Sequence, residues 1–186
     1  MLVTGDLWLS IVLATILCFV GGAVLHMVLP FHRKDWGRLP DEDGVMASLR
    51  SSGVAAGNYM FPCPADPKAM ADPAFQAKFA QGPSGVMTIM PPGPVKMGPA
   101  LAKQFLFHLI VSGTIAYIAA LAMDSGAAYM QVFRFTGTVA LAAYVAAIFP
   151  EAIWYHHPGS YVWGKVVDGI VWSLLTAGSF AGFWPA

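Results

Sequence analysis

The chain has 186 residues, of which 57% are hydrophobic and only 11% are charged. Soluble domains usually carry about 25% charged residues, so this composition is typical of a membrane protein. The formal net charge is zero, which excludes the basic surface of a nucleic-acid-binding protein. Cys18 and Cys63 lie far apart, and Cys18 sits inside an apolar run, so we expect no disulfide between them.

Four apolar segments are long enough to cross a bilayer as helices, which takes about 20 residues each. The first covers residues 7–31. Its apolar core is longer than that of a signal peptide and the residues before it include no basic one, so we expect a spanning helix. The others cover residues 100–123, 129–149 and 161–183, and their short links predict antiparallel neighbours. The predicted fold class is an all-α membrane protein built as a four-transmembrane-helix bundle.

Residues 32–99 separate the first two predicted spans and contain ten of the chain's 14 prolines. This density of proline excludes long helices and predicts a Pro-rich extramembrane cap. The predicted division of the chain is therefore an N-terminal transmembrane helix over 1–31, the cap over 32–99 and a three-helix transmembrane block over 100–186. The apolar side chains of the cap predict that it packs against itself and the membrane face.

Local patterns predict short elements within the cap. Acids over residues 41–43 and Arg50 eight residues after Glu42 are typical of the first and last turns of a short helix. Asp72 followed by Pro73 predicts the start of a second short helix. Residues 85–90 are predicted as a strand that pairs near residues 58–61.

Basic residues indicate the orientation of the chain in the bilayer. Arg33, Lys34 and Arg38 follow the first span, and Lys165 lies at the later turn on the same side. Lys and Arg beside spanning helices favour the cytoplasmic side. We therefore predict an external N-terminus and a cytoplasmic location for residues 32–99.

Each predicted span carries a stripe of small or polar residues at steps of three and four, which places each stripe on one helix face. Lipid offers these groups no hydrogen bonds, so the stripes are predicted to face inward as a polar seam. The four stripes are Thr15, Cys18, Gly22 and His26; Gln104, His108, Ser112, Ala116 and Ala119; Gln131, Arg134, Thr138 and Ala142; and Tyr161, Lys165, Asp168, Trp172, Thr176 and Ser179.

In this topology six ionisable residues gather at the cytoplasmic mouth of the bundle. They are His26, His108, Glu151, His156, Lys165 and Asp168.

Three functional hypotheses use these groups. His26, His108, Glu151 and Asp168 offer ligands for a divalent metal. His26 and His108 alternatively ligate a haem between two helices, or His108 and Asp168 line a proton or small-ion path. The structural alternative is that Lys165 pairs with Asp168 and the remaining groups hydrogen-bond neighbouring helices or face water.

Two further features concern partners. Arg134 lies near the outer end of the third span, where it either snorkels, pairs with Asp124 or contacts an anionic lipid headgroup. Gly178 and Gly182 form a GxxxG motif, which permits close helix contact within the bundle or with a second copy.

No motif identifies a family or a catalytic centre, which favours a non-enzymatic role. The function predicted first is an accessory or scaffold subunit of a larger membrane complex, in contact with lipids and membrane-protein partners. The alternatives are a haem- or metal-binding redox protein that uses His26 and His108, and a small ion or proton transporter built on the polar seam.

Overall fold

The computed structural model describes residues 3–186, and the chain is mostly helical. It divides into two compact units, one formed by Met1–Trp36 with Lys96–Ala186 and the other by Gly37–Val95. The helical unit therefore extends beyond residue 31 and resumes before residue 100. Three helical segments, Thr4–Val28, Met97–Ala122 and Tyr129–Tyr155, are long and apolar enough to cross a membrane.

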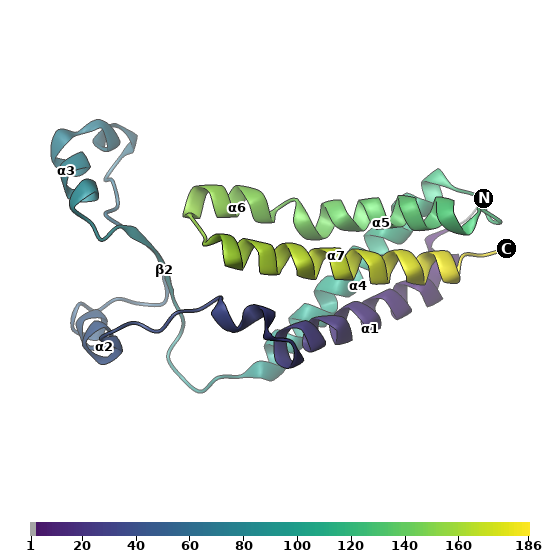
Figure 1. Ribbon diagram of the computed structural model, residues 1–186, viewed down its shortest axis with the longest axis horizontal. Coiled ribbons are helices and arrows are strands. Elements are labelled where there is room, and N and C mark those ends of the chain that lie inside the picture. The colour runs from purple at the N-terminus through teal and green to yellow at the C-terminus, as the bar shows by residue number, and fades with distance from the viewer. Residues whose placement is uncertain (1–2) are drawn as a thin grey trace. The chain divides into compact units, whose positions relative to one another are not determined.

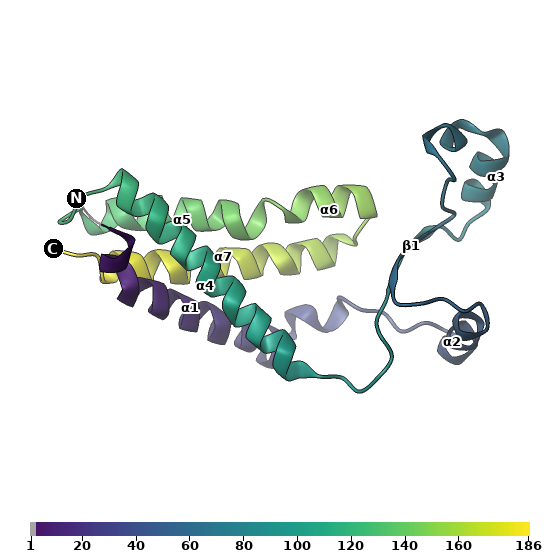
Figure 2. The same cartoon turned by 180° about the vertical axis from the view of Figure 1, so that it is seen from behind.

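The helical unit contains α1 (Trp8–Ala23), α4 (Met97–Ala122), α5 (Tyr129–Val145), α6 (Ile148–Tyr155) and α7 (Gly159–Gly182). In Figures 1 and 2, α7 lies between α1 and α5, and it packs against both. α4 packs against α1 and α5, so each of the four long helices contacts two others.

α7 is helical where a fourth span was predicted, but it is not among the three segments apolar enough to cross a membrane. α7 packs against α1 and α5 and keeps Trp163, Ile170 and Leu174 exposed. Its lower hydropathy reflects the polar and charged residues on the face that it buries. Its buried residues include polar and charged ones: Gly164, Val166, Asp168, Gly169, Ser173, Thr176, Ala177, Ser179, Phe180 and Ala181.

The first helix ends earlier than the sequence predicts. After α1 the chain forms a π-turn, η2 (Val24–Val28), in which the Leu29 N–H donates to the Val24 carbonyl at 3.0 Å. Leu29 is extended, and a 3₁₀ turn, η3 (Pro30–Lys34), follows. The predicted continuous helix to residue 31 is wrong there, because Pro30 lacks the N–H that an α-helix would need.

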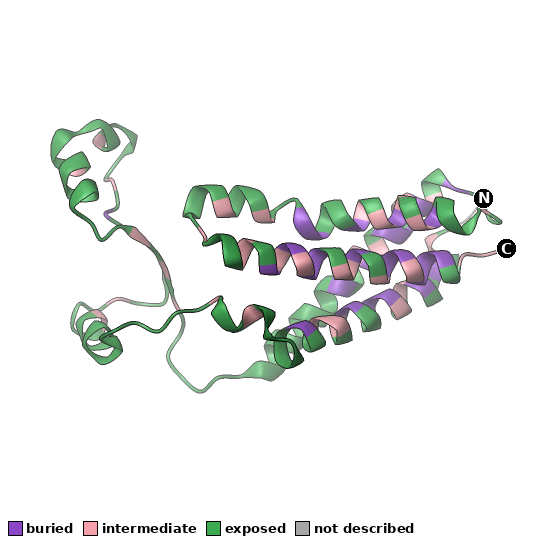
Figure 3. Ribbon diagram, viewed as in Figure 1, coloured by how far each residue is buried: buried purple, intermediate pink, exposed green. Residues whose placement is uncertain are grey.

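The second predicted inward stripe is buried over most of its length, the first and fourth are buried in part, and the third is not buried. Gln131, Arg134, Thr138 and Ala142 are all exposed, and Figure 3 shows exposed and buried residues alternating along α5. α5 instead buries the face formed by Val132, Thr136, Ala140 and Tyr144. Thr136 satisfies its own hydroxyl by donating to the Val132 carbonyl at 2.8 Å, so it needs no polar partner on a neighbouring helix.

The GxxxG motif of α7 is not used for packing within residues 3–186. A Cβ atom placed on Gly178 or Gly182 would meet no heavy atom within 4 Å. The alternative in which the motif serves the helical unit itself therefore loses its support. Self-association through these glycines stays a prediction.

The second unit contains α2 (Glu42–Ser51), β1 (Gly57–Phe61), η4 (Pro67–Ala71), α3 (Pro73–Gln81) and β2 (Gly85–Ile89). The two short helices and the strand pair predicted from local patterns are confirmed. The Asp72 carboxylate caps α3 by accepting from the Ala74 N–H at 2.7 Å. The strands are antiparallel, in register from Gly57 opposite Ile89 to Phe61 opposite Gly85.

This unit has almost no buried interior. Within residues 37–95, Pro62 alone is buried. Large apolar side chains of the unit are exposed: Leu39, Val45, Met46, Met60, Phe61, Met70, Phe79, Val86, Met90 and Val95. The segment therefore contacts itself through strand pairing and through α3 with η4 but lacks a buried core. That it packs against the membrane face stays a prediction.

Candidate functional site

Three residues converge where the first helical segment ends and α7 begins. His26 lies in the π-turn η2, His32 lies in η3, and Asp168 lies in the third turn of α7. Single π-turns are frequent at functional sites because they re-aim the side chains of a helix. Here the π-turn and the reversal at Leu29 bring His26 and His32 to the same carboxylate.

The Asp168 carboxylate is 1% exposed, and each of its oxygens faces a histidine. The distance from Oδ2 to His26 Nε2 is 3.1 Å, and that from Oδ1 to His32 Nε2 is 3.0 Å. The two imidazole rings are stacked, with centroids 3.8 Å apart and planes inclined by 6°. The site thus holds two parallel rings whose Nε2 atoms point at one buried acid.

The second ring nitrogen of His32 faces another carboxylate. Its Nδ1 is 2.7 Å from Asp35 Oδ2, and the Asp35 side chain is only 4% exposed. A neutral imidazole carries one N–H, so it can donate to one carboxylate but not to both. With its one proton on Nδ1, His32 donates to Asp35. Its Nε2, which faces Asp168, then needs either a second proton or a metal ion.

The charges in the cluster lead to the same requirement. Asp35 and Asp168 are both buried, and the one basic side chain beside them is Lys165, whose Nζ is 3.8 Å from Asp168 Oδ2. With neutral imidazoles the site carries one net negative charge. Buried carboxylates without a compensating cation are costly, so a further cation at this point stabilises the site.

The close packing of η3 on α7 depends on a glycine. A Cβ atom on Gly164 would lie 3.1 Å from His32 Cε1 and 3.2 Å from Nδ1. The absence of a side chain there lets the His32 ring approach the α7 backbone. Trp36 packs edge-on against Tyr161, with ring centroids 6.2 Å apart, and holds the end of η3 on the same helix.

The donor set suits a divalent first-row metal. One ligand atom from each of His26, His32 and Asp168 lies within 4.8 Å of the other two. Metal–ligand bonds of about 2.0–2.2 Å place neighbouring ligands roughly 3.0–3.4 Å apart. The nitrogen–oxygen separations of 3.0 and 3.1 Å fit this spacing but are equally those of N–H···O hydrogen bonds. The two rings are parallel here, so both would turn toward a shared ion on binding it. Asp35 bound to His32 Nδ1 matches the outer carboxylate that usually orients a metal-binding histidine.

His108 lies in a different cluster. It is fully buried; its Nε2 is 3.0 Å from Gln104 Nε2, and its Nδ1 is 3.3 Å from the Tyr144 hydroxyl. Its ring also meets the edge of Trp172, with centroids 4.9 Å apart. Protein groups thus occupy both ring nitrogens, and His108 is not brought into the ligand set of His26 and Asp168.

The remaining predicted residues divide between the site and the surface. Lys165 joins the Asp168 cluster. Glu151 is exposed and lies 4.0 Å from His157 Nε2 rather than near Asp168. His156 ends α6 in the left-handed conformation, with φ of 53°, and is exposed. Glu151 therefore lies in the first turn of α6 and His156 at its C-terminal end, both outside the Asp168 cluster.

His32 and Asp35 were missed by the sequence argument. An α-helix continued through residue 31 would place His32 about 240° around the axis from His26, on another face. Pro30 and the spacing of three between His32 and Asp35 were the available signs of a turn. Neither sign indicates how far the chain reverses after Leu29.

No family model, no curated protein and no solved structure matches this chain.

Proposed function

We propose that this protein is an integral membrane protein that binds a divalent first-row transition metal through His26, His32 and Asp168. The observation that carries the proposal is the environment of His32, whose two ring nitrogens both face buried carboxylate oxygens. The membrane location is supported by the three long apolar helical segments. α7 is proposed as the fourth span, packed against α1 and α5 with its exposed apolar side chains toward lipid.

Three protein ligands leave coordination positions for water or another ligand. Two imidazoles with one carboxylate form the open set found in sites that bind substrates at the metal. His26 is 39% exposed, whereas Asp168 is buried, so the metal would be approached from the His26 side. The site is therefore proposed to exchange ligands with the aqueous phase at the end of the helical unit.

A metal titration tests the proposal. Protein purified in mild detergent is treated with a chelator, dialysed and titrated with Co(II), whose visible absorption reports its ligands. We expect one Co(II) per chain, with displacement by Zn(II). If no Co(II) binds, a second proton on His32 provides the positive charge that the site needs. This result would contradict the proposal.

Asp35 is proposed as a positioning residue for the metal. The Asp35→Asn variant removes the negative charge beside His32 Nδ1 and keeps the shape of the side chain. We expect the Co(II) dissociation constant to rise by about 10–100-fold with the stoichiometry unchanged, as for other outer-shell carboxylates. An unchanged dissociation constant in the same titration would remove Asp35 from this role.

The orientation is proposed from the basic residues that follow the first helical segment, with residues 32–99 in the cytoplasm. Cys63 is exposed in the second unit, whereas Cys18 is buried, so Cys63 is a natural reporter of sidedness. A membrane-impermeant maleimide is expected to label Cys63 in lysed cells and not in intact ones. Labelling of intact cells that is lost in a Cys63→Ser variant would reverse the orientation.

An accessory-subunit role is kept as a second candidate because residues 37–95 expose an unusual number of apolar side chains. Met60 and Phe61 of β1 are exposed, as is Val86 opposite Met60, and Met90 at the other end of the strand pair is 79% exposed. Such surface is typical of a segment that binds a partner. Purification in mild detergent is expected to retain a complex of defined stoichiometry, and the double variant Met60→Ser/Phe61→Ser is expected to lose it. Retention of the complex in the double variant would count against this role.

A further inference from the structure

Arg134 is an unpaired cation on a helix that is apolar enough to cross a membrane. It lies in α5, five residues after the helix begins at Tyr129, and it is exposed. Among residues 3–186, no carboxylate lies within 4.0 Å of its guanidinium. The predicted pairing with Asp124 is thus not formed, and the charge of Arg134 is left without a counter-ion.

The depth of Arg134 in the bilayer follows from the length of its segment. Tyr129–Tyr155 has 27 residues. It consists of α5 and α6 with a turn over residues 146–147. At 1.5 Å per residue it rises by at most about 40 Å, which, centred on a 30 Å hydrocarbon layer, would extend about 5 Å beyond each side. The Arg134 Cα atom, about 7.5 Å from the helix start, would lie just inside the hydrocarbon edge, and its side chain would reach back to the phosphate level.

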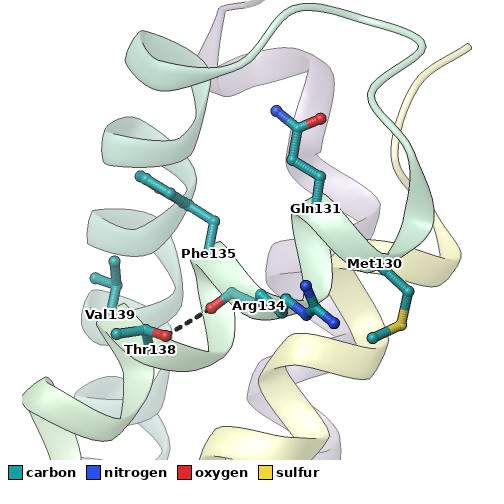
Figure 4. Close-up of a pocket in the computed structure, with 6 residues that line it drawn as sticks. All are labelled: Met130, Gln131, Arg134, Phe135, Thr138 and Val139. Carbon is teal, nitrogen blue, oxygen red and sulfur yellow. Dashed lines mark hydrogen bonds between the residues drawn. The ribbon is translucent and has the colours of Figure 1, made fainter.

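Arg134 lies in an open pocket of about 610 Å³ on one face of α5. The pocket is lined by Met130, Gln131, Phe135, Thr138 and Val139 in addition to Arg134. Figure 4 shows the guanidinium directed toward Met130, while Phe135 and Val139 project from the other side of α5. Gln131 lies nearer the start of the helix, and Phe135 and Val139 lie deeper. The Thr138 hydroxyl donates to the Arg134 carbonyl at 2.7 Å and needs no outside partner. The pocket is therefore polar toward the helix start and apolar below it.

This order of groups matches a phospholipid and not a second copy of the chain. A guanidinium binds phosphate through charge-assisted hydrogen bonds, while exposed apolar side chains deeper along α5, such as Leu141, offer surface to acyl chains. A second copy would have to supply a carboxylate at the depth of Arg134. Within the described spanning segments and α7 the acidic residues are Asp6, Asp168 and Glu151. Asp168 is buried, Glu151 lies at the opposite end of its segment from Arg134, and the Asp6 carboxylate already accepts from the Val3 N–H at 2.9 Å.

We propose that Arg134, with Gln131 and the apolar residues below it, binds the phosphate of an anionic phospholipid against the outer face of α5. The inference rests on the membrane location proposed above and is independent of the metal site. The bound headgroup supplies the counter-ion that the chain does not provide.

Lipid exchange with quantitative mass spectrometry tests the proposal. The full-length protein is equilibrated in detergent with equal amounts of phosphatidylglycerol and phosphatidylcholine of the same acyl chains, re-isolated and analysed for retained lipid. The wild-type protein is expected to prefer phosphatidylglycerol, and Arg134→Gln is expected to lower this preference by about fivefold. Arg134→Lys, which keeps the charge, is expected to retain most of it.

The control is Arg50→Gln, which removes one exposed positive charge from α2 in the other unit and should leave the preference unchanged. An equal loss in Arg50→Gln would reduce the effect to net charge and overturn the proposal, as would an unchanged preference in Arg134→Gln. Displacement of the lipid by millimolar inorganic phosphate would identify a simple anion site and would also overturn the proposal.

Flotation with liposomes measures membrane insertion separately. Protein that fails to float contradicts the membrane location. Protein that floats without a lipid preference contradicts only the lipid site.

Discussion

Replacement of His32 by alanine is expected to abolish Co(II) binding by the purified protein. The variant removes the ligand whose two nitrogens face Asp168 and Asp35, and it leaves His26 and one carboxylate, too few ligands for a stable site. We expect the Co(II) absorption bands to disappear and the dissociation constant to rise by more than about 100-fold, beyond the effect of an outer-shell change.

The matched control is His157→Ala. His157 lies near Glu151 in the turn between α6 and α7, so this variant also loses one imidazole but none of the proposed ligands. It should bind Co(II) as the wild-type protein does. Equal losses in the two variants would mean that Co(II) binds surface histidines at random. His32→Ala also leaves Asp35 without its partner and removes one of the partners of Asp168. Its helical circular dichroism must therefore match that of the wild-type protein for the comparison to count.

A methyl group added to Gly164 is expected to weaken metal binding without removing any ligand. The new Cβ atom would lie 3.1–3.2 Å from the His32 ring and displace it from Asp168. Overpacking of this kind costs about 1–3 kcal/mol, which corresponds to a roughly 5–150-fold rise in the dissociation constant if the strain is relieved by moving His32. The same Co(II) titration measures the effect.

Gly178→Ala is the control for this variant, because the space beside Gly178 is open. Alanine is favoured over glycine inside a helix by about 1 kcal/mol, so the control is expected to be slightly stabilised and to bind Co(II) normally. Wild-type affinity in Gly164→Ala would show that the position of His32 against α7 does not matter for the metal.

The parts of the fold that could be predicted from the sequence are those set by local physics. The long apolar segments predicted α1, α4 and α5, because a run of apolar residues has no other way to avoid water. Asp72 before Pro73 predicted the start of α3, because a carboxylate cap and a fixed φ act within one turn.

The inward face of α5 could not be predicted by the same means. This helix carries small or polar residues on two faces, and only packing against α7 decides between them. The face with Thr136 and Ala140 is buried, whereas the face with Arg134 and Thr138 is exposed. The cost of burying an arginine without an acid partner explains the choice, because no carboxylate of the described neighbouring helices lies within reach of Arg134.

The candidate site was predicted in part. His26, Lys165 and Asp168 could be brought together from helix direction and periodicity alone. His32 and Asp35 could not, because their contribution depends on the π-turn at Val24–Val28 and the reversal after Leu29. His108 was placed near the same end by its depth in α4, but its side chain points to Gln104 and Tyr144. Depth along a helix does not determine which neighbours a side chain meets.

Anomalous X-ray scattering from crystals grown with Co(II) is the most direct test of the metal site. We expect one anomalous peak per chain, at about 2.0–2.2 Å from His26 Nε2, from His32 Nε2 and from an Asp168 carboxylate oxygen. If the site shows no peak and both imidazoles remain hydrogen-bonded to Asp168, the proposed metal site is contradicted.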